Sequence, residues 1–196
     1  MSSPTARKKT PRLNDELVLM FVGLVVFMGI TLIPEIYASM PLPNPYVNHQ
    51  YGFSIKYPDG WHARENYKVR TLAPEDNYTA AVAFHNGSSA IAIEKIPLHD
   101  KTFDDFVASR IAHEQAAVPS KYDFEIRTVS QTRLNGLPAY YVVAHFKGTS
   151  GFATDETYII ADGPSAFDIT LACSDPDCPS AALQFDKSVH SIKFDS

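Results

Sequence analysis

The side chains that most often carry out chemistry do not form a known catalytic pattern in this sequence. His113 and Glu114 are adjacent, as in the zinc-protease pattern H-E-x-x-H, whose second histidine follows the first by one helical turn. That position is Ala117, so the pattern is broken and His113 is interpreted as a surface histidine. The sequence also lacks the G-x-S-x-G nucleophile pattern, a phosphate-binding loop and a dinucleotide fingerprint. It therefore predicts no catalytic residues and a protein that is not an enzyme.

Adjacent acidic residues suggest oxygen ligands for a hard cation such as calcium. They occur as Glu75–Asp76, Asp104–Asp105 and Asp155–Glu156. Calcium takes about six to eight oxygen ligands, so one pair does not make a site. Asp104 and Asp105 are explained by their place at the start of a predicted helix, where negative charge is favourable. Asp175 and Asp177 are the remaining candidates for a calcium site, with a solvated turn as the alternative, and no other cofactor is predicted.

The two cysteines, Cys173 and Cys178, lie in the short segment CSDPDC. In an oxidising compartment this spacing favours a short-loop disulfide. Closing so small a loop stabilises the fold by only about 2 kcal/mol. The alternative is a pair of reduced thiols, because two cysteines alone make a poor metal site.

Two triplets fit the acceptor pattern for N-glycosylation. They begin at Asn77 and Asn86, and both lie at predicted turns, where a glycan can be accommodated. A chain of this length carries one or two such triplets by chance. Both asparagines are therefore candidate glycosylation sites only if the host glycosylates exported proteins.

An uncharged apolar segment near the N-terminus predicts a membrane anchor. Residues 17–33 contain no charged side chain, and as a helix they span about 26 Å, the lower end of what a bilayer core requires. Arg7, Lys8, Lys9 and Arg12 precede it, and positive charge on this side predicts a cytoplasmic N-terminus. We therefore expect a disordered basic cytoplasmic tail at 1–12, a transmembrane anchor at 13–36 and an extracytoplasmic domain. A signal peptide cleaved around Ala38 and a buried helix are the alternatives.

The charge balance argues against nucleic-acid binding. The whole chain carries a formal net charge of −5. Four of the 17 basic and three of the 22 acidic residues precede Ser39, so the remainder carries −6. An acidic domain repels phosphate backbones, and no basic cluster after residue 38 suggests docking to anionic lipid.

The remaining sequence predicts a Pro-rich spacer followed by one α+β domain. Residues 37–48 contain three prolines and cannot hold a helix, so we place a spacer there and the domain at 49–196. Thr102 to Asp105 form a capping box before a helix predicted to end near Ala117. Pro179 begins a second helix. Strands are predicted at 51–57, 67–72, 79–84, 90–96, 124–134, 137–147, 152–161 and 166–173. Asn135–Gly136 is the strongest hairpin signal among their turns.

Three segments of this domain resemble PsbP-like domains. The first is YGFSIKYPDGW, in which Tyr51, Phe53, Tyr57, Pro58 and Trp61 carry the motif. The second is LNGLPAY, which begins at Leu134 and is similar to that family's central hairpin. The third is FDKSVHSIKF, which begins at Phe185 and is similar to its last helix and closing strand, with Ile192 where the family has a phenylalanine.

The resemblance implies an α-β-α sandwich around a large antiparallel sheet and an extracytoplasmic or lumenal location. The best-known PsbP-like protein is an extrinsic subunit that helps to retain calcium and chloride at the oxygen-evolving centre of photosystem II. This chain differs by its predicted anchor and has no cysteine near residue 38 that could carry a lipid. The family pattern offers no catalytic residues to transfer.

Two functional hypotheses follow from the sequence. The first is an accessory or binding module that interacts with, or stabilises, a membrane or cell-envelope protein complex. The second is a small-ligand or metal-binding domain, or an enzyme, whose site is built from residues far apart in sequence. The predicted anchor, the spacer and the absence of catalytic motifs favour the first.

Overall fold

The computed structural model describes residues 42–69, 78–118, 123–148, 151–174 and 178–195. The chain divides into two compact units, Met1–Met40 and Pro41–Ser196, and every described residue belongs to the second unit. The predicted tail and anchor, Asn77, Asp175 and Asp177 lie outside the described residues. Within the described ranges no helix is both long and apolar enough to cross a membrane.

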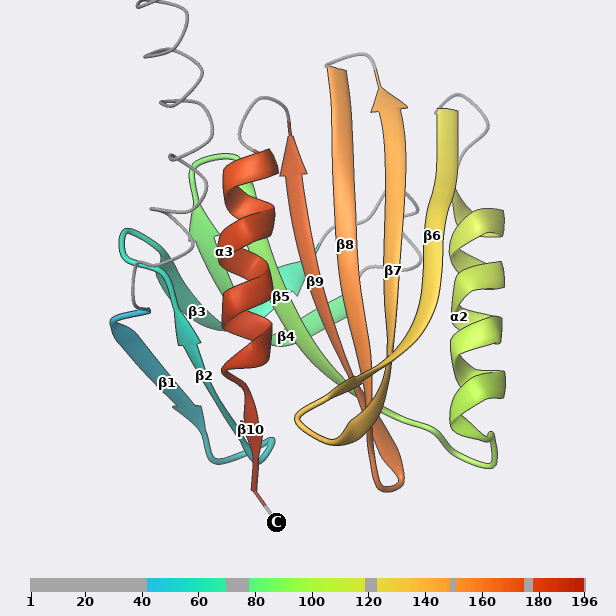
Figure 1. Cartoon of the computed structure of the whole chain (residues 1–196), viewed down its shortest axis with the longest axis horizontal. Helices are drawn as coiled ribbons and strands as arrows, with labels where there is room; N and C mark the ends of the chain where they lie inside the picture. The colour runs from blue at the N-terminus through green and yellow to red at the C-terminus, as the bar shows by residue number, and fades with distance from the viewer. Residues whose placement is uncertain (1–41, 70–77, 119–122, 149–150, 175–177, 196) are drawn as a thin grey trace, which may run out of the picture. The chain divides into compact units, whose positions relative to one another are not determined.

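In the described part of the chain, seven strands form the main antiparallel sheet (Figure 1). They are β3 (His62–Val69), β4 (Tyr78–Asn86), β5 (Ser89–Pro97), β6 (Asp123–Leu134), β7 (Leu137–Gly148), β8 (Gly151–Asp162) and β9 (Ser165–Ser174). Their spatial order is β3-β4-β5-β9-β8-β7-β6. The predicted meander of four long strands is confirmed as β6 to β9, and β9 closes it against β5.

The described residues also form a three-stranded sheet, ordered β1-β2-β10. It consists of β1 (Asn44–Asn48), β2 (Phe53–Tyr57) and β10 (Lys193–Phe194). The sequence placed residues 44–48 in the spacer, whereas the structure pairs them with β2. Pro45 is compatible with a strand here because β1 is an edge strand, where a missing N–H need not break the ladder.

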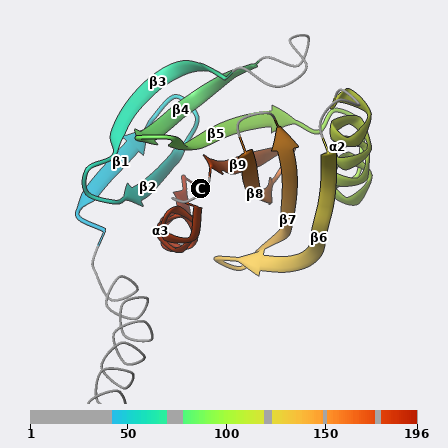
Figure 2. The same ribbon diagram turned by 90° about the horizontal axis from the view of Figure 1, so that it is seen from above.

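Two helices lie on opposite faces of the main sheet (Figure 2). Helix α2 (Phe103–Ala117) begins as predicted at the N-cap Thr102, whose Oγ1 accepts a hydrogen bond from the Asp105 N–H at 3.2 Å. It ends before Pro119, which cannot continue a helix. Helix α3 (Cys178–His190) lies on the other face, beside the small sheet. The α+β class is therefore confirmed, with strands divided between two sheets instead of one.

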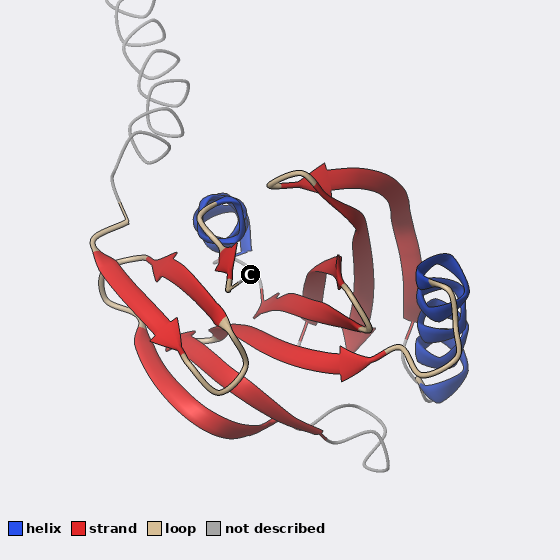
Figure 3. Cartoon of the chain, turned by 90° about the horizontal axis from the view of Figure 1, so that it is seen from below, coloured by secondary structure: helices blue, strands red, loops and turns tan. Residues whose placement is uncertain are grey.

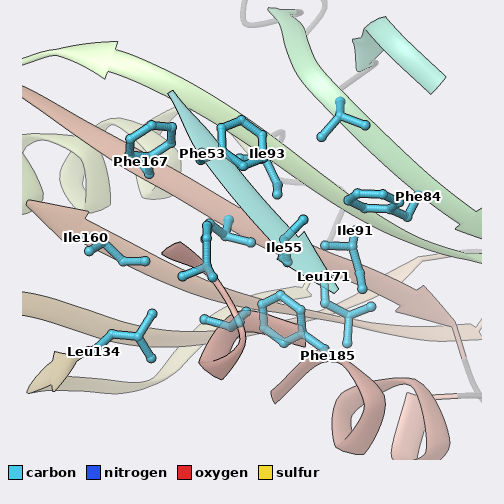
Figure 4. Packing of buried hydrophobic residues seen from close by; sticks show 14 of the residues in the cluster. Phe53, Ile55, Phe84, Ile91, Ile93, Leu134, Ile160, Phe167, Leu171 and Phe185 are labelled. Atoms are coloured by element: carbon cyan, nitrogen blue, oxygen red, sulfur yellow. The ribbon is translucent and has the colours of Figure 1, made fainter. Parts of the chain in front are cut away.

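The main hydrophobic core lies between the large sheet on one side and α3 with the small sheet on the other (Figure 4). Phe53 of β2 contacts Phe167 of β9 edge to face, with ring centroids 5.6 Å apart. Phe185 of α3 is fully buried in the same cluster. The alternation along β9 explains this arrangement, because Phe167, Ile169 and Leu171 all point to the α3 face.

Helix α2 lies on the opposite face of the sheet (Figure 3), and a smaller hydrophobic core lies under it. Phe106 and Val107 of the helix pack with Leu98, Ile159 and Ala166. Most of these apolar contacts come from the first half of α2, and Ile111 of the second half adds to them. The second half also faces polar side chains of the sheet.

The β6–β7 hairpin confirms the turn predicted from sequence. Asn135 and Gly136 both have positive φ, 51° and 86°, as a two-residue turn of this kind requires. Leu134 and Leu137 pair directly across it. The turn brings Asn135 against the end of α3, because its Nδ2 donates a hydrogen bond to the Ile192 carbonyl.

Candidate functional site

The motif residues predicted from the opening strand have a structural role. The Trp61 indole is buried, and its Nε1 donates a hydrogen bond to Gln184 Oε1 of α3 at 2.8 Å. Tyr57 stacks on Phe84 with ring centroids 4.6 Å apart. Tyr51 precedes β2 in a turn, and its N–H donates to Asn48 Oδ1. Phe53 is in the core and Pro58 is buried, so these residues fix the small sheet and α3 and do not form a ligand site.

The predicted disulfide between Cys173 and Cys178 is confirmed. Their Cα atoms are 5.2 Å apart, and both residues are buried. Cys173 ends the core face of β9, and Cys178 begins α3. The bond therefore ties the start of α3 to the sheet that it covers.

Other sequence candidates lie apart from one another. His113 is exposed on α2, and Asp104 and Asp105 occupy the first turn of that helix. Asn86 is exposed at the end of β4, where it pairs with Ser89 across a tight turn. Among the side chains that the structure describes, no group of three or more His, Cys, Asp or Glu residues is placed to hold a metal ion.

An open groove of about 660 Å³ lies where α3 ends, between the β6–β7 turn and the C-terminal segment. Its apolar lining includes Leu137, Ile192 and Phe194. The charged side chains around it are the cationic Lys56 and Lys193 and the anionic Asp162 and Asp195, together with His190. A groove with apolar lining and polar edges resembles the composition of protein-binding surfaces.

The walls of this groove are held by hydrogen bonds between segments that are distant in sequence. The Ser191 hydroxyl accepts from the Lys56 N–H at 2.8 Å and donates to the Ser188 carbonyl at 2.7 Å. The Asp195 N–H donates to the Gly52 carbonyl at 2.9 Å. Gly52 has a positive φ of 72°, a conformation that favours glycine. These bonds fix β10 against β2 and give the groove a defined shape.

Lys95 forms an ion pair with Asp162, which lines the groove. Its Nζ lies 3.0 Å from Asp162 Oδ2, and it also sits over the Phe167 ring at 4.8 Å from the centroid. The Tyr51 carbonyl accepts a longer hydrogen bond from the same Nζ at 3.4 Å. Both charged partners are about one-third exposed, so the pair helps to position Asp162 but adds little stability.

A tyrosine–carboxylate network continues from the groove along the α3 face. Tyr158 donates its hydroxyl to Asp186 at 3.0 Å, and Tyr141 donates to Glu156 at 2.8 Å. The two tyrosine rings are 4.8 Å apart. Burial is the main cause that raises the pKa of each tyrosine above its ordinary value, and the neighbouring carboxylates add to it. Both hydroxyls are therefore donors at neutral pH.

A second polar cluster, which sequence analysis missed, lies under the last two turns of α2. Arg110 contacts Asp168 Oδ2 through Nε at 3.0 Å and through the terminal amino group at 2.9 Å. Thr170 donates to the other oxygen, Oδ1, at 2.8 Å. Asp168 is 3% exposed, so it is a buried carboxylate whose one cationic contact among the described residues is Arg110. The attraction of Asp168 is the main cause that raises the pKa of Arg110.

Three further carboxyl groups surround this ion pair and carry perturbed pKa values. Burial, and to a lesser extent the charges of Glu114 and Asp168, raise the pKa of Asp155 to about 8. Burial, and to a lesser extent the charge of Asp168, raise the pKa of Glu94 to about 7. The pKa of Glu114 is also raised, first by burial. The sequence signal for this cluster was Asp168 itself, an acidic residue inside the apolar run of a strand.

Comparison with known proteins agrees with the fold derived above. No sequence profile of a known family and no sequence of a characterised protein matches the chain. Among solved structures, cyanobacterial PsbP (CyanoP) from Synechocystis sp. PCC 6803 is similar at a TM-score of 0.58 and 14% identity, over 77% of this chain and 91% of that one.

A protein from Bacteroides thetaiotaomicron VPI-5482 is similar at a TM-score of 0.55 and 12% identity, over 80% of this chain and half of that one. At these identities the similarity concerns the fold alone. The domain therefore has a PsbP-like fold, as the sequence motifs suggested.

Proposed function

We propose that this chain is an accessory binding module, held at the outer face of a membrane by residues 17–33, that docks onto a protein of a membrane or envelope complex. The observation that carries the proposal is the groove at the end of α3. It joins an apolar lining to charged groups of both signs, and its wall includes the strand β10. The PsbP-like fold supports a general role in interaction, and no catalytic activity forms part of the proposal.

The groove suits an extended peptide segment better than a reactive substrate. The half-buried Leu137 and Phe194 offer apolar contact, whereas Ile192 is fully buried. Lys56 and Lys193 can pair with acidic side chains at the margin of the groove. Charged groups at such a margin steer association and fix orientation more than they add affinity. We therefore propose a partner segment with apolar residues flanked by acidic ones.

The predicted calcium site at Asp175 and Asp177 and the glycans at Asn77 and Asn86 remain proposals.

A small amphipathic ligand in the groove at the end of α3 is the competing proposal, because an apolar lining with polar edges accepts either a peptide segment or a small molecule. The two differ in size: a protein partner changes the mass of the particle by tens of kilodaltons, whereas a small ligand leaves it unchanged.

The test is the migration of the full-length chain on native gels after mild detergent extraction from its own membrane. The variant Lys56→Glu/Lys193→Glu reverses both cationic groups of the groove. The matched control, Lys68→Glu, reverses an exposed lysine of β3. We expect the wild type and the control to migrate in a larger complex and the groove variant to migrate alone. Migration of the wild type as a single chain, or equal migration of both variants, would contradict the proposal.

A further inference from the structure

Helix α2 rests on two chemically different surfaces. Its first half packs on the apolar cluster that contains Ile159 and Ala166. Its second half, from Arg110 onward, adds Ile111 to that cluster and otherwise faces ionisable groups. Those that face it from the strands are Tyr78 of β4, Glu94 of β5, Asp155 of β8 and Asp168 of β9, and those on the helix itself are Arg110, His113 and Glu114.

The positions of these ionisable groups follow from the periodicity of α2 and from the register of the strands beneath it. Phe106, Arg110 and Glu114 recur every four residues and so share one face of α2. On the sheet, Asp168 is registered opposite Glu94 on one side and Ile159 on the other. The helix therefore presents an apolar side chain, then a cation, then a carboxyl group to the sheet beneath it.

The charges in this interface are not balanced. Arg110 is committed to Asp168, which also accepts a hydrogen bond from Thr170 at 2.8 Å. Thr170 is in turn within 2.9 Å of Thr157, so the hydroxyls between the carboxyl groups are already paired. Among the described residues, no ion pair joins Glu94, Glu114 or Asp155 to a cation, although the charge of Arg110 favours the ionised forms of Glu94 and Glu114.

Among these carboxyl groups, Asp155 is the one whose ionisation is energetically least favourable. Its Oδ1 is shielded from solvent and has no hydrogen-bond partner among the residues that the structure describes. An ionised carboxylate oxygen without solvent or partner is strongly disfavoured, and such a group takes up a proton instead. The local geometry thus favours the neutral acid at position 155 while α2 is in place.

We infer that the last two turns of α2 form a proton-controlled latch, which lies closed on the sheet while Asp155 and its neighbouring carboxyl groups hold protons and lifts when they ionise. This inference is independent of the proposed binding function. The latch, residues 110–117, lies on the opposite face of the sheet from the groove. The proposed pH-dependent opening therefore concerns α2 and not the groove.

The pH range of the latch follows from the raised pKa values. Folded-state pKa values of about 8 for Asp155 and about 7 for Glu94 lie above the ordinary value near 4 of an unfolded carboxyl group. The closed state therefore binds more protons than the open one, and its stability falls as pH rises. The stabilisation is complete below about pH 4, falls progressively as pH rises from there, and is lost by about pH 8.

The test is hydrogen–deuterium exchange of the full-length chain in detergent at about pH 5.5 and about pH 8.5, after correction for the intrinsic pH dependence of exchange. For the wild type we expect the opening of residues 110–117 to increase about tenfold or more at the higher pH, which corresponds to a shift of one pKa unit or more. Peptides covering the first half of α2 serve as an internal reference and should change less.

Asp155→Asn removes the group with the most strongly raised pKa but keeps its size, and it should reduce the difference in protection between the two pH values, although Glu94 and Glu114 still titrate. The matched control is Asp186→Asn, an exposed carboxylate on α3, which should retain the full wild-type response. Glu94→Gln provides a second variant if Asp155→Asn does not fold, and it should reduce the response. A wild type without pH-dependent opening, or variants at 155 and 94 that respond like the wild type, would overturn the inference.

Discussion

Arg110 on α2 directs two nitrogen atoms at a single oxygen of Asp168 on β9, with both contacts at 3.0 Å or less. Asp168 is 3% exposed, whereas the Arg110 side chain keeps about a third of its exposure. The ion pair is thus asymmetric: the buried anion has only Arg110 and the Thr170 hydroxyl as partners among the described residues, whereas the cation also reaches solvent. Removing Arg110 and removing Asp168 should therefore change the stability of the domain by different amounts.

Arg110→Gln should destabilise the domain more than Asp168→Asn does. Loss of the guanidinium leaves a buried carboxylate without its counter-charge, which costs about 3 kcal/mol. Loss of the carboxylate leaves an arginine that can still reach water, as its partial exposure permits. Urea unfolding of the two variants measures the difference, and a smaller loss for Arg110→Gln would contradict the asymmetry.

Trp61→Ala should lower the free energy of unfolding by about 3–5 kcal/mol, because it empties a buried aromatic site between β2 and α3. Trp61→Phe should cost much less, since it keeps most of the buried ring and loses mainly the hydrogen bond to Gln184, worth about 1 kcal/mol. Thermal melts followed by circular dichroism compare the two. Equal losses would mean that the hydrogen bond, and not the packing of the ring, fixes α3.

Reduction of the Cys173–Cys178 bond should lower stability by about 2 kcal/mol, because the closed loop is short. The fluorescence of Trp61 reports the change directly, since it is the only tryptophan and contacts α3. The double variant Cys173→Ala/Cys178→Ala should behave like the reduced wild type and be insensitive to reductant. Continued sensitivity of the double variant would show that the reductant acts elsewhere.

Intact mass of the protein from its native membrane tests the proposed topology. An uncleaved chain should have a mass near 21.7 kDa, lowered by two protons for the disulfide, and glycan increments at Asn77 or Asn86 would indicate export in a glycosylating host. A mass that lacks about 38 N-terminal residues, as expected after signal-peptide cleavage, would show a released protein. In that case a membrane-bound role would be withdrawn.

Local signals in the sequence were sufficient for most of the individual elements. Thr102 and Asp105 marked the start of α2, and Asn135–Gly136 marked the β6–β7 turn, because caps and tight turns depend on a few adjacent residues. The division of the strands between two sheets was not predictable in this way. Pairing of β10 with β2 joins residues about 140 positions apart, and alternation of side chains carries no information about such partners.

The groove and the latch were missed for the same reason. The groove combines Lys56, the turn at Asn135 and the segment after His190, and no short pattern connects them. Asp155 and Glu156 were seen as an acidic pair, but adjacent strand residues point to opposite faces. Only the placement of α2 reveals that Asp155 lies in the helix interface, while Glu156 accepts a hydrogen bond from Tyr141 on the other face.

Site-specific photo-crosslinking in intact native membranes tests most directly the proposal that the groove at the end of α3 contacts a protein partner at the membrane. A photoreactive amino acid at Lys193 or Lys56 should give one discrete adduct larger than the chain, and the same amino acid at Lys68 on β3 should give none. Adducts of equal yield from all three positions, or none from the groove positions, would contradict the account.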